Sequence, residues 1–252
     1  MSNVNDFFSE KNTVYDTSDI KKFNLEKFIK SIEAFARVTY KSVYVINYHS
    51  KGFDYVSENP LFLCGNSATE VKQMGYAFYF KHVPEEDLEL LLKVNTAGFD
   101  FYEQIPREER LDYTISYDFN LIGKDGNQFL VNHKLTPVVL NTKGKIGKAL
   151  CLVSLSNKET KGNVTIVNEK TGVIHTYNLE KNYWETKTKI KLKPREIEIL
   201  QLSARGYTLE EIGEKIFVSS NTVKFHRKKI FEKMEVHSIS EAIAYATANK
   251  LL

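Results

Sequence analysis

The sequence is poor in the residues that mark metal, redox or membrane proteins. Its 252 residues include two cysteines, Cys64 and Cys151, in apolar surroundings and without a Cys-x-x-Cys spacing. Because zinc and redox sites need closely spaced thiols, we expect both to be buried free thiols in a reducing compartment. No stretch approaches the ~20 apolar residues of a membrane helix, and the first residues lack the features of a signal peptide. We therefore expect a cytoplasmic protein without a membrane partner.

An excess of charge of one sign is also lacking. The formal net charge is +3, and apolar residues make up 42% and charged residues 27% of the chain. These values exclude a disordered protein, so a packed core is expected, and any basic surface for nucleic acid must be local. The patterns Gly-x-Ser-x-Gly, Walker A and His-Glu-x-x-His do not occur, so the sequence does not predict an enzyme.

The first part of the chain mixes helical and strand-like patterns. Residues 1–24 are polar and lack periodicity, but apolar side chains at helical spacing from Leu25 to Ala36 predict an amphipathic helix. Alternating apolar residues then predict strands, and the pair Asp125-Gly126 is typical of a hairpin turn. The expected strands cover residues 42–47, 53–56, 114–122, 129–139 and 149–156, and the expected helices cover 67–74 and 84–96. This order predicts an α+β fold with an antiparallel sheet, one face of which is covered by helices.

The pattern changes after residue 158. Two short strands, 164–167 and 173–177, are interpreted as a hairpin that links two domains, with Trp184 isolated behind it. From Lys193 the apolar period becomes 3.6 in short segments, which predicts a compact four-helix bundle. The predicted parts are an N-terminal segment with the amphipathic helix (1–35), a mixed domain (36–158), a hairpin linker (159–188) and a helical domain (189–252).

Helix start and stop signals divide the last domain. Pro194 suits the first position of a helix, and Gly206 suits its end. Thr208 with Glu211 predicts a capping box for the second helix, and Ser219 predicts the N-cap of the third.

The third helix of this domain has two different faces. Apolar positions Val223, Ile230 and Met234 are expected to face inward, and Asn221, Lys224 and Lys228 share the opposite side. Its basic residues outnumber the single acid Glu232; they are Lys224, Arg227, Lys228, Lys229 and Lys233. Such a helix can pack on its own domain and bind DNA phosphates at once.

These residues resemble the helix-turn-helix of the LuxR family of transcription regulators. The resemblance rests on Leu192-Lys193-Pro194-Arg195-Glu196, Gly206, Glu211-Ile212-Gly213, the run from Ser219 to His226, and Lys233-Met234. Two departures are visible: Lys193 replaces a hydroxyl N-cap, and Gly213 replaces an alanine at a cost of up to ~1 kcal/mol in helix propensity.

The resemblance implies a double-stranded DNA partner and the residues that would face it. It places Lys224, Phe225 and Lys228 at the bases, and Thr222, His226 and Arg227 near phosphates or in support of the helix. His226 has a second interpretation as a half-buried packing residue. The expected DNA-facing set is Ser220, Asn221, Thr222, Lys224, Phe225, His226, Arg227, Lys228 and Lys229.

The final predicted helix, residues 240–250, carries small apolar residues at Ala242, Ile243 and Ala246. In the LuxR family this element pairs two copies on a palindromic site, which implies a homodimer. The same residues also suit the fourth wall of the bundle core. RNA polymerase is a candidate further partner of such a regulator.

The mixed domain resembles a PAS domain. The resemblance rests on residues 55–62, 65–71 and 82–87, the turn 124–126 and the segment 144–147. It implies a cavity for a small ligand, or a dimerisation or partner-docking module that binds none. An autoinducer-binding domain is a rival interpretation, and a phosphorylated receiver domain is disfavoured because the strands cluster. No cofactor is predicted with certainty: Cys64, His82, His133 and the aromatic residues 76–80 are mainly expected to be structural.

Overall fold

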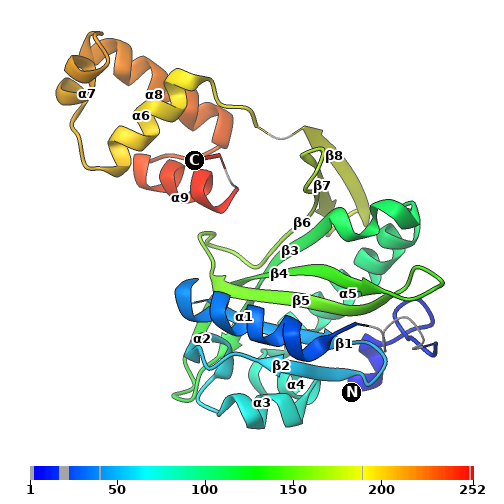
Figure 1. Cartoon of the computed structure of the whole chain (residues 1–252). Coiled ribbons are helices and arrows are strands. Elements are labelled where there is room, and N and C mark those ends of the chain that lie inside the picture. The colour runs from blue at the N-terminus through cyan, green and yellow to red at the C-terminus, as the bar shows by residue number, and fades with distance from the viewer. Residues whose placement is uncertain (1–2, 17–22, 40, 189, 250) are drawn as a thin grey trace. The chain divides into compact units, whose positions relative to one another are not determined.

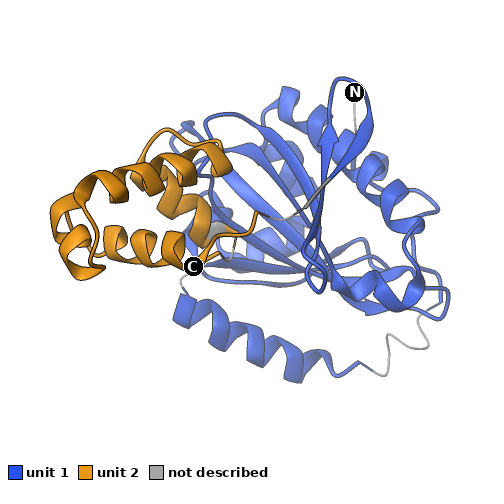
Figure 2. Cartoon of the chain, turned by 90° about the horizontal axis from the view of Figure 1, so that it is seen from above, with its two compact units in different colours: residues 1–187 blue, residues 188–252 orange. Residues whose placement is uncertain are grey.

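The computed structural model describes residues 3–16, 23–39, 41–188, 190–249 and 251–252. The chain forms two compact units, Met1–Lys187 and Thr188–Leu252, which are coloured separately in Figure 2. Within the described residues, no helix is long and apolar enough to cross a membrane.

The first unit is built on an antiparallel sheet (Figure 1). Its strands are β1 (Ser42–Asn47), β2 (Gly52–Val56), β3 (Tyr113–Ile122), β4 (Gln128–Leu140), β5 (Ile146–Leu155), β6 (Gly162–Asn168), β7 (Val173–Asn178) and β8 (Tyr183–Thr188). They lie in the order β2-β1-β5-β4-β3-β6-β7-β8. The five expected strands of the mixed domain are confirmed, in the arrangement β2-β1-β5-β4-β3, and this sheet resembles that of a PAS domain.

Helices cover the two faces of this sheet unequally. Between β2 and β3 the chain forms α2 (Pro60–Leu63), α3 (Ala68–Met74), α4 (Ala77–His82), α5 (Glu85–Glu103) and the 3-10 helix η3 (Arg107–Asp112). Their apolar residues share a core with Tyr44 and Ile46 of β1. The neighbouring residues Val43 and Val45 point to the other face and pack with Ile32 of α1 (Leu25–Thr39). The expected amphipathic helix is therefore present, while the short helices α2 and α4 were not predicted.

The polar N-terminal segment contributes to the main core. A 3-10 helix, η1 (Val4–Phe7), is capped by Asn3. The side chain of Asn3 accepts a hydrogen bond from the Asn5 backbone N–H at 2.8 Å. Phe7 is buried and its ring centroid lies 5.4 Å from that of Tyr76. Periodicity could not reveal this segment because its buried residues, which include Val14, are isolated in a polar context. Residues 17–22 lie outside the described residues.

The predicted hairpin before the last domain is present, but it is part of the sheet. Strand β6 pairs antiparallel with β3, with Ile115 opposite Ile166, and β7 pairs with β6. The interpretation of residues 159–188 as a linker is corrected by this pairing. The residues around Trp184, which were expected to belong to the linker, form β8. Val164 and Ile166 are buried because they extend the apolar surface begun by β3.

The second unit is the predicted helical bundle. It contains α6 (Pro194–Ala204), α7 (Leu209–Lys215), α8 (Ser220–Met234) and α9 (Ile239–Ala248). One aliphatic core joins all of them and includes Ile199, Ile212, Val223, Ile230 and Ala242. The bundle therefore has its own interior.

Candidate DNA-binding helix

Side-chain caps fix where the helices of the second unit begin. The Thr208 hydroxyl accepts from the Glu211 backbone N–H at 3.2 Å, and the Glu211 carboxylate accepts from the Thr208 N–H at 2.8 Å. Ser219 caps α8 by accepting from the Thr222 N–H at 3.2 Å, and its hydroxyl also lies 2.9 Å from that of Thr222. The predicted capping box and N-cap are therefore in place, and they set the first turn of α8.

The turn between α7 and α8 depends on a close approach at Gly213. A Cβ atom at this position would lie 2.6 Å from the carbonyl oxygen of Val218. Gly213 lowers helix propensity, but the absence of a side chain also allows the turn at residues 218–220 to pack directly against α7. The departure from the family alanine has a local structural reason.

Two long side chains attach α8 to α6. Lys233 donates to both carboxylate oxygens of Glu196, at 2.8 and 2.6 Å, and Glu196 is only 1% exposed. Burial alone would raise the pKa of Glu196, but the bonds from Lys233 and from the Lys193 N–H hold the pKa below its usual value. Lys233 is therefore neutralised within the bundle and adds little to the charge available to DNA.

Arg227 is the second attachment of α8 to α6. Its Nη2 donates to the Ser203 hydroxyl of α6 at 2.8 Å, and its Nε is buried without a hydrogen-bond partner. Burial lowers the pKa of Arg227 from its usual value. This bond agrees with the expected support of the helix, and the alternative role, contact with a phosphate, stays a prediction. Sequence reasoning assigned no role to Ser203, because nothing in its local pattern reveals a bond across 24 positions.

The outward face of α8 gathers the remaining basic residues. Asn221, Lys224, Phe225, Lys228 and Lys229 are exposed, while Val223 and Ile230 are buried on the opposite side. Phe225 is 54% exposed, and the Lys229 ammonium lies 4.3 Å from the centre of its ring. The helix is thus apolar toward its own bundle and cationic toward solvent.

The other expected DNA-facing residues lie around this face. Asn221, Lys224, Phe225 and Lys228 line a surface hollow together with Leu209, Arg227, Phe231 and Ile239. Ser220 lines a different hollow, near the exposed Phe217. Thr222 and His226 are half-buried, and the His226 ring centroid lies 6.0 Å from that of Phe225. Contact of this set with DNA stays a prediction.

The interpretation of α9 as the fourth wall of the bundle is confirmed. Ala242 and Ala246 are fully buried in the core of their own bundle. They form the fourth wall of this bundle, whereas the pairing of two copies through α9 stays a prediction. Ile243 is half-buried.

Comparison with known proteins identifies the second unit. Residues 191–246 match the family described as bacterial regulatory proteins, luxR family. Residues 191–246 are a luxR-type helix-turn-helix. The chain is 48% identical over 61 residues to the oxygen regulatory protein NreC of Staphylococcus carnosus (strain TM300). That match covers 24% of this chain and 28% of the relative, so the chain spans just over a quarter of the length of the NreC proteins that it matches.

Solved structures also match parts outside the luxR-type domain. A structure of the Vibrio cholerae VqmA dimer, described as a LuxR-type receptor, has 16% sequence identity and a TM-score of 0.30, covering 90% of this chain and 88% of that one. A PAS domain from Colwellia psychrerythraea has 14% identity and a TM-score of 0.37, covering 52% of this chain and 96% of that one.

Residues considered for a cofactor in the first unit have structural partners. His133 is buried, its Nε2 lies 2.6 Å from the Tyr44 hydroxyl, and burial lowers its pKa to about 3. The His82 Nδ1 lies 3.2 Å from the Ile122 carbonyl oxygen. Cys64 and Cys151 are free and buried, as expected, and burial raises the pKa of the Cys64 thiol to about 12. Among the described residues, no group of histidine, cysteine and acidic side chains could hold a metal ion.

Proposed function

We propose that the chain is a transcription regulator that binds double-stranded DNA through the outward face of α8. The observation that carries this proposal is the division of that helix: Val223 and Ile230 are buried, and Lys224, Lys228 and Lys229 are exposed. A helix of this kind can enter the major groove while its other side holds it on a rigid bundle. The match to the luxR family over residues 191–246 supports the same proposal.

The lysines have different tasks in this proposal. Lys224 and Lys228 lie one turn apart, beside Asn221 and Phe225, and line the same hollow. We assign them to base edges, where a lysine can donate to guanine O6 or N7. Lys229 lies over the Phe225 ring and is assigned to a phosphate. Arg227 is left out of the contact set because it is held by Ser203.

The test starts from DNA that the full-length protein selects out of random duplexes. Binding isotherms on the selected duplex and on a scrambled one, at several salt concentrations, then give the specificity ratio and the salt slope. We expect specific binding at least 10³-fold tighter than binding to the scrambled duplex. Equal affinity for both duplexes at every salt concentration would contradict a sequence-specific regulator.

We further propose that the regulator acts as a homodimer joined through α1. A palindromic site needs two recognition helices, and the alanines of α9 are used within the bundle. On α1, Phe35 is 48% exposed and Val38 is 87% exposed, although Ile32 of the same helix is buried against the sheet. A second copy that covers this outward apolar face would bury both residues. Val38→Glu should shift the protein toward monomer in sedimentation, whereas Lys30→Glu on the same helix should not.

The first unit is proposed to sense a small ligand and to fold independently of the luxR-type domain. Because β6 to β8 belong to the sheet, proteolysis should leave a stable fragment that ends near residue 188 rather than near residue 158. A ligand-free docking module or an autoinducer-binding domain are the alternatives, and native mass spectrometry of the purified protein separates them by the mass retained. We propose a regulatory, non-catalytic role in the cytoplasm, with RNA polymerase as a further partner.

A further inference from the structure

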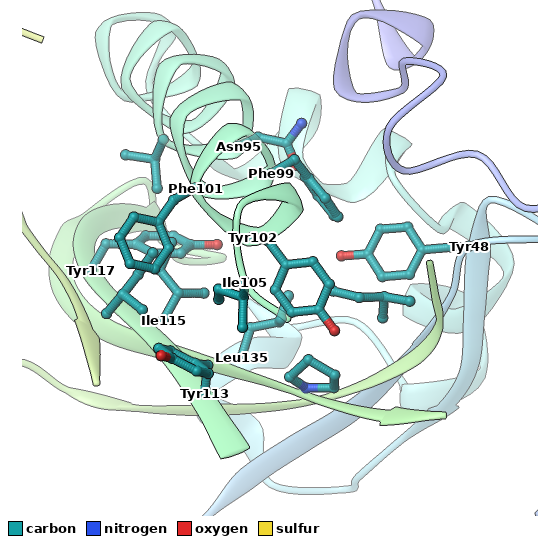
Figure 3. A pocket seen from close by; sticks show the side chains of 15 residues that line it. Tyr48, Asn95, Phe99, Phe101, Tyr102, Ile105, Tyr113, Ile115, Tyr117 and Leu135 are labelled. Atoms are coloured by element: carbon teal, nitrogen blue, oxygen red, sulfur yellow. The ribbon is translucent and has the colours of Figure 1, made fainter. Parts of the chain in front are cut away.

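A cavity lies between α5 and the sheet of the first unit (Figure 3). Its volume is about 60 Å³, several times what a single ordered water needs. Rings from three elements line it: Tyr48 follows β1, Phe101 and Tyr102 belong to α5, and Tyr113 and Tyr117 belong to β3. Rings that surround a space in this way favour a flat, largely apolar occupant.

The lining is neutral. Among the described residues, no charged side chain and no histidine or cysteine lines this cavity. A charged occupant would lose its water shell in a site whose lining carries no charged side chain, which costs several kcal/mol. His133 and His82, the histidines considered for a cofactor, are bonded elsewhere in the core. The lining therefore favours a neutral compound without a bound metal.

One polar group at this cavity is left without a partner. The Tyr102 side chain is 9% exposed, and its hydroxyl is buried with no hydrogen bond. The ring is held in place by the Arg110 guanidinium, which lies 5.2 Å from its centre and donates to the carbonyl oxygens of Ile105 and Gly144. Burial raises the pKa of Tyr102, so the hydroxyl keeps its proton and can donate a hydrogen bond to an acceptor. A buried donor without an acceptor is unfavourable, and a ligand oxygen or nitrogen would relieve that cost.

Phe101 connects this cavity to the end of the sheet. Its ring centroid lies 6.3 Å from that of Tyr113 in the cavity lining, 4.7 Å from that of His175 on β7 and 5.0 Å from that of Trp184 on β8. Strand β8 is the last element before the luxR-type domain in the chain. Trp184 is also the one tryptophan of the sequence, so its fluorescence reports on this contact.

We infer that the cavity binds a small neutral ring compound whose hydrogen-bond acceptor pairs with Tyr102, and that Phe101 transmits its binding to Trp184 and β8. The site stands on the cavity, its neutral lining and the unpartnered hydroxyl. The effect on DNA binding rests, in addition, on the function proposed above.

Three probes of similar size test the chemistry of the site. Benzyl alcohol carries a neutral acceptor, ethylbenzene has the same shape without one, and benzoate carries a charge. Each is titrated into the full chain while Trp184 fluorescence is recorded, with free N-acetyltryptophanamide as the control for simple quenching. We expect saturable responses to benzyl alcohol and ethylbenzene and none to benzoate. No saturable response to any of them, or saturation by benzoate, would overturn the inference.

The variant Tyr102→Phe isolates the hydrogen bond. It removes one hydroxyl and keeps the ring, so the fold is retained. The affinity for benzyl alcohol should fall by roughly 3- to 10-fold, which corresponds to one neutral hydrogen bond, and the affinity for ethylbenzene should not fall. Tyr15→Phe is the matched control because Tyr15 is exposed and lies outside the cavity. An equal loss for both probes would show that Tyr102 does not pair with the acceptor.

Transmission is tested on the selected DNA duplex. Saturating benzyl alcohol should change the DNA affinity by roughly five-fold or more, which is a typical coupling between two sites. Unchanged DNA affinity with a clear Trp184 response would overturn transmission to the luxR-type domain. Absence of specific DNA binding with or without the probe would instead refute the proposed function, while the Trp184 titration still decides the site.

Discussion

The interiors of the two units are built from different chemistry. The core of the sheet unit contains Tyr44, Tyr48, Tyr76 and Tyr79, whose hydroxyls are buried together with the His133 imidazole. The core of the luxR-type bundle has no aromatic residue among its described buried members, which are isoleucine, leucine, valine, methionine and alanine. Its one buried carboxylate, Glu196, is paired with Lys233.

Because of this difference, the two interiors are suited to different functions. Aliphatic side chains fill the bundle and require no hydrogen bonds, so the bundle can hold α8 in one position. Tyrosines and a histidine in the sheet unit must find partners, and the Tyr102 hydroxyl and the His133 Nδ1 have none. An interior with unsatisfied donors and a cavity can gain free energy from a ligand. In the bundle, the buried side-chain atom without a partner among the described residues is Arg227 Nε, in the side chain that attaches α8 to α6.

The largest expected effect concerns the charged pair of the bundle. Lys233→Met leaves Glu196 as a buried charge without its cation, and we expect the bundle to lose about 3 kcal/mol of stability. Urea unfolding followed by helical circular dichroism reports on both units, and Trp184 fluorescence follows the sheet unit alone; the transition seen by circular dichroism but not by fluorescence measures this loss. Lys229→Met, at an exposed position of the same helix, is the control and should change stability by less than about 0.5 kcal/mol. Equal effects of the two variants would show that the pair does not stabilise the bundle.

The next effect concerns the outward face of the rigid helix. Lys224→Ala should weaken binding to the selected duplex by about 2 kcal/mol and binding to scrambled DNA by less, because the base contact proposed for Lys224 would be lost. Lys229→Ala should weaken both duplexes alike and reduce the salt slope by about one phosphate contact. The isotherms must be recorded on variants with wild-type circular dichroism. An unchanged specificity ratio for Lys224→Ala would place the base-reading surface elsewhere.

The polar core of the sheet unit should respond to acid. Burial lowers the pKa of His133 to about 3, whereas the unfolded chain binds this proton near pH 6.5. Between these values the unfolded state holds more protons, so stability falls as the pH falls below about 6.5, by up to about 1.4 kcal/mol per pH unit. Urea midpoints from Trp184 fluorescence at several pH values give the slope. His133→Gln should reduce that slope by one proton; the same slope in both proteins would exclude His133 as the cause.

The smallest effect compares one glycine in each unit. Family resemblance alone suggests that Gly213→Ala should stabilise α7, but the new Cβ would meet the Val218 carbonyl oxygen at 2.6 Å. We expect a net loss of about 1 kcal/mol, because strain of this kind exceeds the gain in helix propensity. Gly98→Ala in α5 would meet only the end of the Ile115 side chain, at 3.0 Å, and should be close to neutral. Thermal unfolding of both variants decides the sign, and stabilisation by Gly213→Ala would refute the close approach.

The sequence predicted best where local chemistry decides the structure. Thr208, Glu211 and Ser219 cap their helices as expected because a cap depends on neighbours three residues away. The strands around the Asp125-Gly126 turn followed from alternation and turn chemistry in the same way. The roles of Lys233 and Arg227 could not be derived, since their partners Glu196 and Ser203 lie far away in the sequence. Basic residues look alike in a sequence whether they face solvent or a buried carboxylate.

Pairing between strands that are distant in the sequence could not be predicted either. The hairpin of β6 and β7 was visible from its residues, but its attachment to β3 joins Ile115 to Ile166 across 51 positions. Burial on a sheet edge leaves the same alternating pattern whichever strand is the neighbour. Phe7 and Val14 show the same limit in the N-terminal segment, where isolated apolar residues give no period.

Because β8 belongs to the sheet, the tether to the luxR-type domain is short. Strand β8 ends at Thr188 and α6 begins at Pro194, which leaves the five residues 189–193 between them. Fully extended, such a tether spans about 20 Å, less than the 34 Å or so of one turn of DNA. In the proposed dimer, each luxR-type domain could then move only a short distance from its own sheet unit. The dimer would tolerate little change in the distance between half-sites. Operator spacing, and not only operator sequence, would therefore be part of what this chain recognises.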